Sequence, residues 1–300
     1  MPPARPAPSV YAVLFLANVV FASSYGVTRV VLVDVPPATL ALARSVVGAA
    51  LLVGYGWSAL RRERIRSRDH GRIALMGVVG FALAFGLGNW GIAHSTASNA
   101  ALLITVEPMA LLLLSPVLLG ERLSRREAVG AALALTGAVV VVVNGVPGLT
   151  RSIVPHWRGD LLLVASGVAY AAYSLLGRGV LGRYPVIVVT AWSIVWGALA
   201  TAPLAWLEWR AGLMPRWTPG AIVGTLYLGV VITALGYAVW NWALERAGAS
   251  RVAIFVNVQP VAGAVIGVWW LHEPLGVFMV LGGLAILTGL HLAVKADRTE

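Results

Sequence analysis

The chain has 300 residues, of which 59% are hydrophobic and only 11% are charged. A soluble domain of this length carries about 25% charged residues, so this composition excludes an ordinary soluble globule and indicates a membrane protein. The net charge is +10, and the absence of cysteine excludes a disulfide framework, a Cys-ligated zinc site and an iron–sulfur cluster. The arginines fall in short segments between apolar runs, which favours a role in membrane topology over nucleic-acid binding.

Ten apolar segments are long enough to cross a bilayer, which requires about 20 residues per helix. We expect the transmembrane helices at 10–33, 37–60, 72–93, 98–119, 125–145, 159–181, 185–207, 219–243, 250–271 and 275–294. The first of them is longer than the roughly 7–15 residues of a signal-peptide core, so it is expected to remain as an uncleaved helix. The Pro-rich stretch 1–9 before it is expected to be disordered.

The Arg and Lys residues predict how these helices are oriented. With the N-terminus in the cytoplasm, sixteen of them fall in inside loops and tails, and four fall in outside loops. Such an excess is typical of cytoplasmic loops. The sequence therefore predicts a multi-pass protein with both termini in the cytoplasm.

The two halves of the chain match each other when the sequence is shifted by 152 residues. The aligned pairs include Asn89-Trp90 with Asn241-Trp242, Ala97-Ser98 with Ala249-Ser250, Pro108 with Pro260, Glu121 with Glu273, and Gly130 with Gly282. Each half holds five helices, and an odd number makes the second half enter the membrane upside down. We expect two inverted repeats, 10–146 and 159–294, with a periplasmic linker at 147–158 and a cytoplasmic tail at 295–300.

The fourth helix and its copy carry a motif that resembles a known family. The stretch Leu102-Ile-Thr-Val-Glu-Pro-Met-Ala, followed by Leu118-Leu-Gly-Glu-Arg-Leu-Ser, resembles the signature of the EamA family in the drug/metabolite transporter superfamily. The second copy reads Val256-Asn-Val-Gln-Pro-Val-Ala and then Trp270-Leu-His-Glu-Pro-Leu. The resemblance implies the all-α drug/metabolite transporter fold, an inner-membrane location and export of small metabolites. The length and pattern are similar to bacterial amino-acid exporters of the YddG type.

Glu107 lies near the middle of the fourth expected helix, next to Pro108. A carboxylate at bilayer depth costs roughly 2.5–3.5 kcal/mol on insertion scales, so it has to face a cavity, find a partner or take up a proton. Two interpretations stay open, namely a proton-coupling or substrate-amine site and a packing residue. Its mate, Gln259, cannot titrate. Pro108 and Pro260 interrupt helices four and nine at matching places and are predicted hinges, with a fixed bend as the alternative.

Polar side chains on six of the expected helices are candidates for a binding cavity at the membrane midplane. They are Asn18, Ser24 and Tyr25, then Asn89 and Trp90, Glu107, Tyr173, Tyr237 and Asn241, and Gln259. Such groups cannot all face lipid, so they either line a cavity or join helices to each other. For Trp90 a place in the interfacial aromatic belt is the competing interpretation. Arg44, in the second helix, either binds a substrate carboxylate or pairs with a carbonyl, or snorkels towards the headgroups, which is favoured. Arg29 lies nearer the outer end of the first helix, where snorkelling is favoured more strongly.

Two acidic residues at helix ends and four glycines within helices also have predicted structural roles. Glu121 and Glu273 end helices four and nine, and each is expected to cap the helix that follows or to act as a gate at one mouth. The pairs Gly130 with Gly137 and Gly282 with Gly289 are seven residues apart and predict close helix contacts.

Together these features predict a secondary transporter that exports small metabolites, amino acids before other classes, by alternating access at a midplane cavity. Export of nucleobases or nucleosides, sugars or drug-like compounds is the alternative, followed by a channel or a membrane-embedded enzyme. The sequence has no Walker A, Gly-x-Ser-x-Gly or His-Glu-x-x-His motif, and no enzyme activity, metal or cofactor is expected. The expected partners are the substrate and membrane lipids. The sequence leaves open whether protons are coupled to transport, and whether the protein is a monomer or a weak homodimer.

Overall fold

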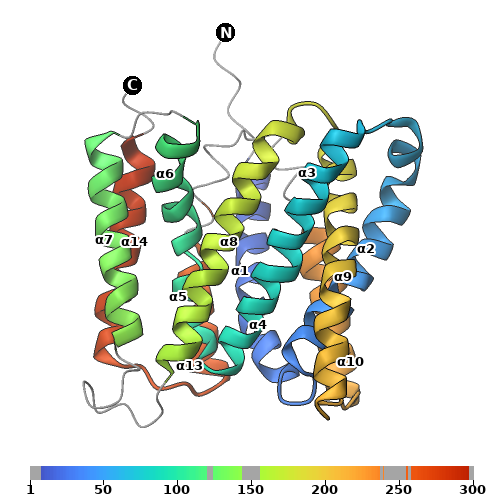
Figure 1. Ribbon diagram of the computed structural model, residues 1–300. Coiled ribbons are helices and arrows are strands. Elements are labelled where there is room, and N and C mark those ends of the chain that lie inside the picture. Colours follow the sequence, from blue (N-terminus) through green and yellow to red (C-terminus); the bar gives the residue numbers. More distant parts are fainter. Residues whose placement is uncertain are drawn as a thin grey trace.

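The computed structural model describes residues 8–119, 124–143, 156–236, 239, 255 and 258–296. All regular structure in these ranges is helical, and the helices stand side by side in one bundle (Figure 1). Seven helices in the described ranges are long and apolar enough to span a membrane, and three shorter apolar helices accompany them. The predicted fold class is therefore confirmed, an all-α membrane protein built from ten segments.

The helices follow the expected segments closely. Their bounds are α1 Pro8–Val31, α2 Pro37–Arg62, α3 Ser67–Gly77, η1 Val78–Ala84, α4 Phe85–Ala93, α5 Ala97–Leu103, α6 Val106–Leu119, α7 Arg125–Val143, α8 Trp157–Leu181, α9 Val186–Arg210, α10 Pro219–Tyr227, η2 Leu228–Leu235, α13 Val258–Trp270 and α14 Val277–Ala296. The third segment, expected at 72–93, begins earlier and runs without a gap through α3, η1 and α4. The start of α1 and the end of α14 lie at the same end of the bundle (Figure 1), as an even number of crossings requires.

Two stretches of π-helix interrupt the third and eighth segments, a feature that the sequence analysis did not predict. The stretches η1 and η2 overlap when one half is shifted onto the other. Within η2, Oγ1 of Thr233 donates a hydrogen bond of 2.9 Å to the carbonyl of Leu228, five residues earlier. A π-helical turn holds an extra residue and so redirects the side chains near it, which is why such turns are frequent at functional sites.

The fourth segment is broken between α5 and α6. Pro108 has no N–H to donate to the carbonyl of Ile104, four residues earlier. That carbonyl instead accepts a 3.0 Å hydrogen bond from the N–H of Glu107, and Oγ1 of Thr105 donates to the carbonyl of Leu102 at 2.6 Å. The chain therefore leaves the α-helical path just before Glu107, and Pro108 falls in the first turn of α6, where proline is tolerated.

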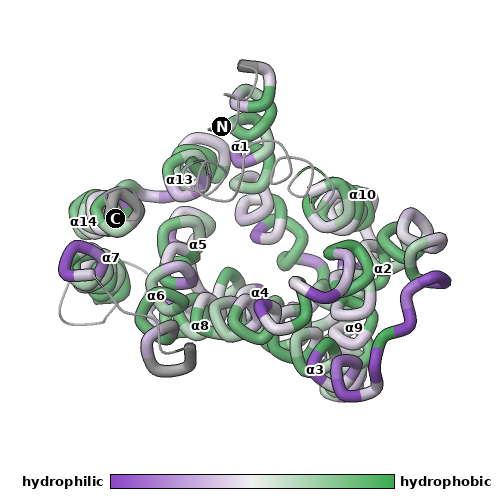
Figure 2. The backbone as a smooth tube through the Cα atoms, turned by 90° about the horizontal axis from the view of Figure 1, so that it is seen from above, coloured by the Kyte–Doolittle hydropathy of each residue, from purple (hydrophilic) through white to green (hydrophobic). Residues whose placement is uncertain are grey.

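The last helices of the two halves, α7 and α14, pack together at one edge of the bundle (Figure 2). A Cβ atom on Gly137 would lie 2.5 Å from the carbonyl oxygen of Gly282, and one on Gly130 would lie 2.6 Å from that of Gly289. Side chains larger than hydrogen do not fit at these distances. The predicted close contact through these four glycines is confirmed, and each helix meets its equivalent in the other half.

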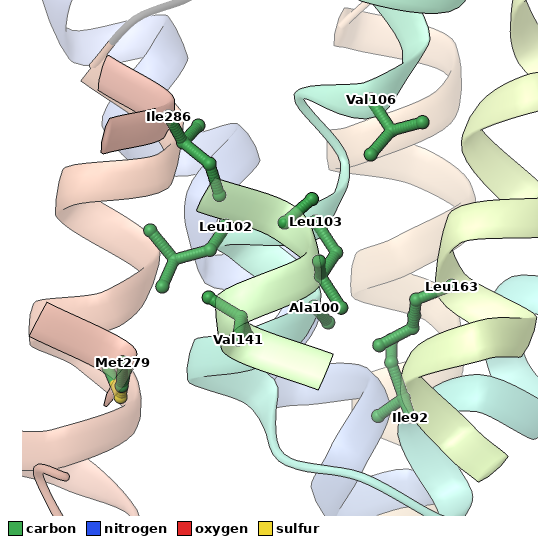
Figure 3. Packing of buried hydrophobic residues seen from close by; sticks show 10 residues of the cluster. Ile92, Ala100, Leu102, Leu103, Val106, Val141, Leu163, Met279 and Ile286 are labelled. Carbon is green, nitrogen blue, oxygen red and sulfur yellow. The ribbon is translucent and has the colours of Figure 1, made fainter. Parts of the chain in front are cut away.

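A buried apolar cluster fixes α5 against this helix pair (Figure 3). Leu102, Leu103 and Ala100 of α5 contribute to it, together with Val141 of α7 and Ile286 of α14. Lipid tails are as apolar as these side chains, so helix association in a membrane depends on close packing rather than on removal from water. The cluster consequently holds the helix just before the break in the fourth segment.

Candidate functional site

A cavity of about 580 Å³ lies between helices of both halves of the chain. Its walls come from α1, α4, α6, α8, η2 and α13, and from single residues of α2, η1, α5 and α14. All six segments that were expected to form the walls contribute to them. Ligand pockets commonly have volumes of about 300–1,000 Å³, so the cavity has room for a small metabolite.

Six of the ten predicted binding residues line this cavity. They are Ser24, Tyr25, Asn89, Glu107, Tyr173 and Gln259. Both predicted hinge residues, Pro108 and Pro260, also line it, and Pro260 belongs to α13. Tyr237 and Asn241 lie outside the described residues.

Asn18 and Trp90, two further predicted binding residues, do not line the cavity. Asn18 is fully buried, and its Oδ1 accepts a 2.8 Å hydrogen bond from Nε2 of Gln259, so it orients a cavity residue from behind. Trp90 borders a separate pocket beside Glu208. Consecutive side chains of a helix point about 100° apart, so Asn89 can face the cavity while Trp90 faces away.

Glu107 lies in the first turn of α6, directly after the break, and faces the cavity. Its Oε1 accepts a long hydrogen bond of 3.4 Å from the hydroxyl of Ser174 on α8. The ion pairs found among the described residues are formed by Asp160, Asp69 and Asp34, and not by Glu107. The N-terminus of a helix stabilises a negative charge, so the N-terminal end of α6 can stabilise the carboxylate of Glu107.

Arg44 is a second charged residue of the cavity, and the expectation that it snorkels to the headgroups is wrong. It is only 9% exposed, and its guanidinium carbon lies 4.1 Å from the centroid of the Phe85 ring. Its Nη2 donates a 3.5 Å hydrogen bond to Oγ1 of Thr233 in η2. Stacking on an aromatic face and the hydroxyl from the π-helix hold the guanidinium inward. A single arginine within an apolar helix is visible in the sequence and could have indicated a cavity residue. The π-helix that places Thr233 beside it could not be predicted from the sequence.

An aromatic wall continues from Phe85 along the cavity. Phe85 packs against Tyr170 with ring centroids 5.9 Å apart and against Phe81 at 5.3 Å, and Phe81 in turn packs against Tyr173 at 5.6 Å. Phe85, Tyr170 and Tyr173 line the cavity. Neither Phe85 nor Tyr170 was among the predicted binding residues, because an aromatic residue in a transmembrane helix needs no ligand to explain it.

Glu273 caps α5 from the other half of the molecule, instead of the helix that follows it. Its Oε1 accepts a 2.6 Å hydrogen bond from the N–H of Ala97, and its Oε2 accepts from the N–H and the hydroxyl of Ser98 at 2.8 and 2.5 Å. His272 has a φ of 55°, and the N–H of Glu273 bonds back to the carbonyl of Gly267, so the chain reverses after α13. This reversal aims the carboxylate at α5. Glu121, its equivalent in the first half, lies outside the described residues.

Glu208 makes the corresponding cap on α2. Its carboxylate accepts hydrogen bonds of 2.8 Å from the N–H groups of Ala38 and Thr39, and one of 2.9 Å from Oγ1 of Thr39. Thus Glu208 at the end of α9 and Glu273 beyond α13 each cap the equivalent helix of the first half. Both caps lie at the end of the bundle opposite the start of α1 (Figure 1).

Two further polar ties lie at the same end. Arg29, expected to snorkel, instead donates from Nη1 to the carbonyls of Ile92 and Ala93 at 2.7 and 2.9 Å, which caps the end of α4. Asp160 is fully buried and accepts hydrogen bonds from Ser95 and from Nδ2 of Asn99. These hydrogen bonds join α1 to α4, and they join α8 to α5 and to the segment just before it.

The chain matches the model of one protein family in both halves. The EamA-like transporter family matches residues 8–143 and again residues 157–295. A probable terminal-alkyne amino-acid exporter of Streptantibioticus cattleyicolor is 33% identical over 282 residues, which cover 91% of this chain and 89% of the relative. An uncharacterized transporter of Archaeoglobus fulgidus is 25% identical over 282 residues, covering 94% and 96%. A solved crystal structure of 20% sequence identity has the same fold, with a TM-score of 0.65 over 97% of this chain and 99% of its own.

Proposed function

The chain belongs to the EamA-like transporter family, and we propose that it is a secondary transporter that exports amino acids by alternating access at the central cavity. The observation that carries this proposal is the cavity itself, which is formed by both halves and contains Glu107 and Arg44. Charged residues within a membrane are costly, and they usually mark a substrate or ion pathway. Transport of a small molecule follows from the family, whereas the substrate and the direction are the proposal.

Amino acids are preferred among the substrate classes for two reasons. A relative that spans most of this chain is described as a probable amino-acid exporter. A cavity with one acidic and one basic side chain also suits a substrate that carries both charges. Nucleobases, nucleosides, sugars and drug-like compounds are the other classes to be tested.

In the proposed cycle, the two halves move against each other around the cavity. Pro108 and Pro260 serve as hinges, because both line the cavity and Pro108 directly follows the break in the fourth segment. The contact of Glu273 with α5 serves as a gate, because α13 and α5 both line the cavity and belong to opposite halves. Protons either drive this cycle through Glu107 or take no part in it.

The location proposed for the protein is the inner membrane, with both termini in the cytoplasm. The excess of Arg and Lys in the predicted inside loops supports this orientation. It places the caps formed by Glu208 and Glu273 on the outer side, so the gate at Glu273 would close the cavity from the outside.

Counterflow into proteoliposomes tests the proposal. Purified protein is reconstituted with a high internal concentration of one unlabelled amino acid, nucleobase or sugar, and uptake of the labelled compound is followed. We expect transient, saturable accumulation of at least one amino acid, and none in protein-free liposomes. Linear flux without accumulation would indicate a channel. Counterflow of nucleobases or sugars without any amino acid would overturn the substrate class.

A further inference from the structure

We infer that the segment 61–68, which joins α2 to α3, binds the headgroups of anionic phospholipids. Five of its residues are arginines and one, Glu63, is acidic; the arginines are Arg61, Arg62, Arg64, Arg66 and Arg68. All five are exposed. Figure 2 shows this segment, here called the basic turn, as a hydrophilic stretch at the outer edge of the bundle, where lipid surrounds the protein.

The positive charge of the basic turn is not neutralised within the described part of the chain. The ion pairs found among the described residues involve Arg183, Arg216 and His156. Asp69, the acidic residue that follows the turn, is buried, and its carboxylate already binds Arg183 and the hydroxyl of Tyr184, each at 2.9 Å. The turn therefore presents an excess of positive charge to its surroundings, and such a surface attracts an anionic partner.

The backbone of the turn is held in place without the use of its guanidinium groups. Ile65 is half-buried and packs against a buried apolar cluster that includes Ile73 and Val180. The N–H of Arg66 donates a 3.2 Å hydrogen bond to the hydroxyl of Tyr184. A guanidinium presents a planar fork of N–H donors that matches a phosphate with two parallel hydrogen bonds. Because the backbone is already fixed, less conformational entropy is lost when such a partner binds.

Two aromatic residues place the basic turn at the level of the lipid headgroups. Tyr55 and Trp57, in the last two turns of α2, are 79% and 56% exposed, and Tyr and Trp gather at the membrane–water interface. The guanidinium carbon of Arg61 lies 5.9 Å from the centroid of a Trp57 ring. Residues 63–66 alone separate α2 from α3, and four residues span at most about 14 Å. The turn thus stays beside the membrane surface, and a basic cluster in this place is typical of anionic lipid binding.

Membrane orientation does not by itself require so dense a cluster. The other loops expected on the inside carry two or three arginines each. The equivalent connection of the second half, between α9 and α10, has Arg210 before it and Arg216 within it. Arg216 pairs with Asp34 at 2.8 Å, and the guanidinium carbon of Arg210 lies 4.8 Å from the centroid of a Trp206 ring. The repeated fold therefore does not account for the arginines of the basic turn.

Lipid retention tests this assignment. Purified protein is placed in vesicles of equal parts phosphatidylglycerol and phosphatidylcholine and extracted with a neutral detergent, and the lipids that stay bound are counted by mass spectrometry. The test variant changes three exposed arginines of the turn together, namely Arg62→Gln, Arg64→Gln and Arg68→Gln. The matched control loses the same charge from exposed positions elsewhere, namely Arg125→Gln, Arg126→Gln and Arg158→Gln.

We expect wild-type protein to retain phosphatidylglycerol about fivefold over phosphatidylcholine, since basic clusters beside a membrane helix favour anionic lipids. The test variant should lose most of this preference, and the matched control should keep it. Lysines at the same three positions should preserve a part of it, because the charge remains and the bidentate fork is lost. Glu63→Arg should increase the preference, and it tests the assignment without removing any arginine.

A preference that stays equal to that of the wild type in the test variant or in Glu63→Arg, or an equal loss in the matched control, would overturn the inference. Displacement of the lipid by glycerol phosphate or by a short poly(U) RNA would also overturn it, because the ligand would then be a soluble phosphate or a nucleic acid. None of these measurements involves transport, so their outcome is independent of the counterflow that tests the proposed function.

Discussion

Oε2 of Glu273 accepts two hydrogen bonds from Ser98, one from its N–H at 2.8 Å and one from its hydroxyl at 2.5 Å. The two residues belong to opposite halves of the chain and are separated by 175 positions. They join the reversed chain after α13 to the first turn of α5, and both helices continue into the cavity wall. The gate proposed above depends on this single carboxylate.

Glu273→Gln is expected to loosen this end of the cavity. A glutamine has one acceptor oxygen, and its NH₂ group would face the N–H donors of Ala97 and Ser98. The sequence contains no cysteine, so a cysteine placed at Ile104 in the cavity wall is the only labelling site. We expect a membrane-impermeant maleimide added from outside to react several-fold faster with this cysteine in Glu273→Gln than in the parent.

Glu208→Gln in the same Ile104→Cys background serves as the control for the gate. It removes a matching cap from α2, which contributes to the cavity only through Arg44. The labelling rate should stay near that of the parent. Equal rates in Glu273→Gln and the parent would show that the contact is a structural cap and not a gate.

Glu107→Gln tests whether protons take part in transport. Glutamine cannot titrate, so a transporter that is driven through Glu107 would lose the pH dependence of its counterflow rate. The rate is measured between pH 5 and pH 8 at saturating substrate, so that weaker binding does not confuse the result. Ser174→Ala is the control, because it removes the hydrogen-bond partner and keeps the titratable group. Full transport with unchanged pH dependence in Glu107→Gln would exclude a proton role for this residue.

Gly137→Leu is expected to destabilise the contact between α7 and α14. A Cβ at this position would already lie 2.5 Å from the carbonyl oxygen of Gly282, so leucine would force the helices apart. Overpacking of this kind costs roughly 1–3 kcal/mol, and we expect the midpoint of thermal unfolding to fall by several degrees. Gly54→Leu is the control, since no atom lies within 4 Å of a Cβ there. Equal midpoints for the two variants would contradict the packing argument.

Glu208→Ala is expected to lower stability through the loss of the cap on α2. The substitution leaves two buried N–H groups and the Thr39 hydroxyl without their acceptor, and loss of a capping side chain costs roughly 0.5–2 kcal/mol. Thermal unfolding of the purified protein measures the change. Glu63→Ala, an exposed position after the end of α2, should leave the midpoint close to that of the wild type.

Reporter fusions test the orientation. Alkaline phosphatase fused after Glu300 should be inactive and green fluorescent protein at the same position should fluoresce, because the C-terminus is expected in the cytoplasm. A phosphatase fusion within the outside segment 211–218 should be active. An active phosphatase at the C-terminus would reverse the proposed orientation and would place the cap of Glu273 on the inner side.

The sequence predicted which polar residues approach the cavity better than it predicted their partners. Glu107 and Gln259 were identified because a polar residue in an apolar helix is costly, and both line the cavity. Trp90 was wrongly assigned to the cavity together with its neighbour Asn89, which does line it. The hydrophobic pattern could not separate the two, because a helix that is apolar nearly all round shows no polar face. Glu273 was expected to cap the helix that follows it, but its carboxylate accepts from the first residues of α5, a helix far away in the sequence.

The class of the protein and its ten segments could be predicted from the amino-acid sequence, because the bilayer sets the length and composition of each segment. The relation between the two halves could be predicted as well, because the repeat is visible as matched residues. The sequence also identified the glycines of α7 and α14, because small residues mark close helix contacts wherever they occur. The position of Arg44, in contrast, could not be predicted without the folded chain. Its inward orientation depends on Phe85 and on Thr233 in a π-helix 189 residues away, and neither contact can be read from local sequence.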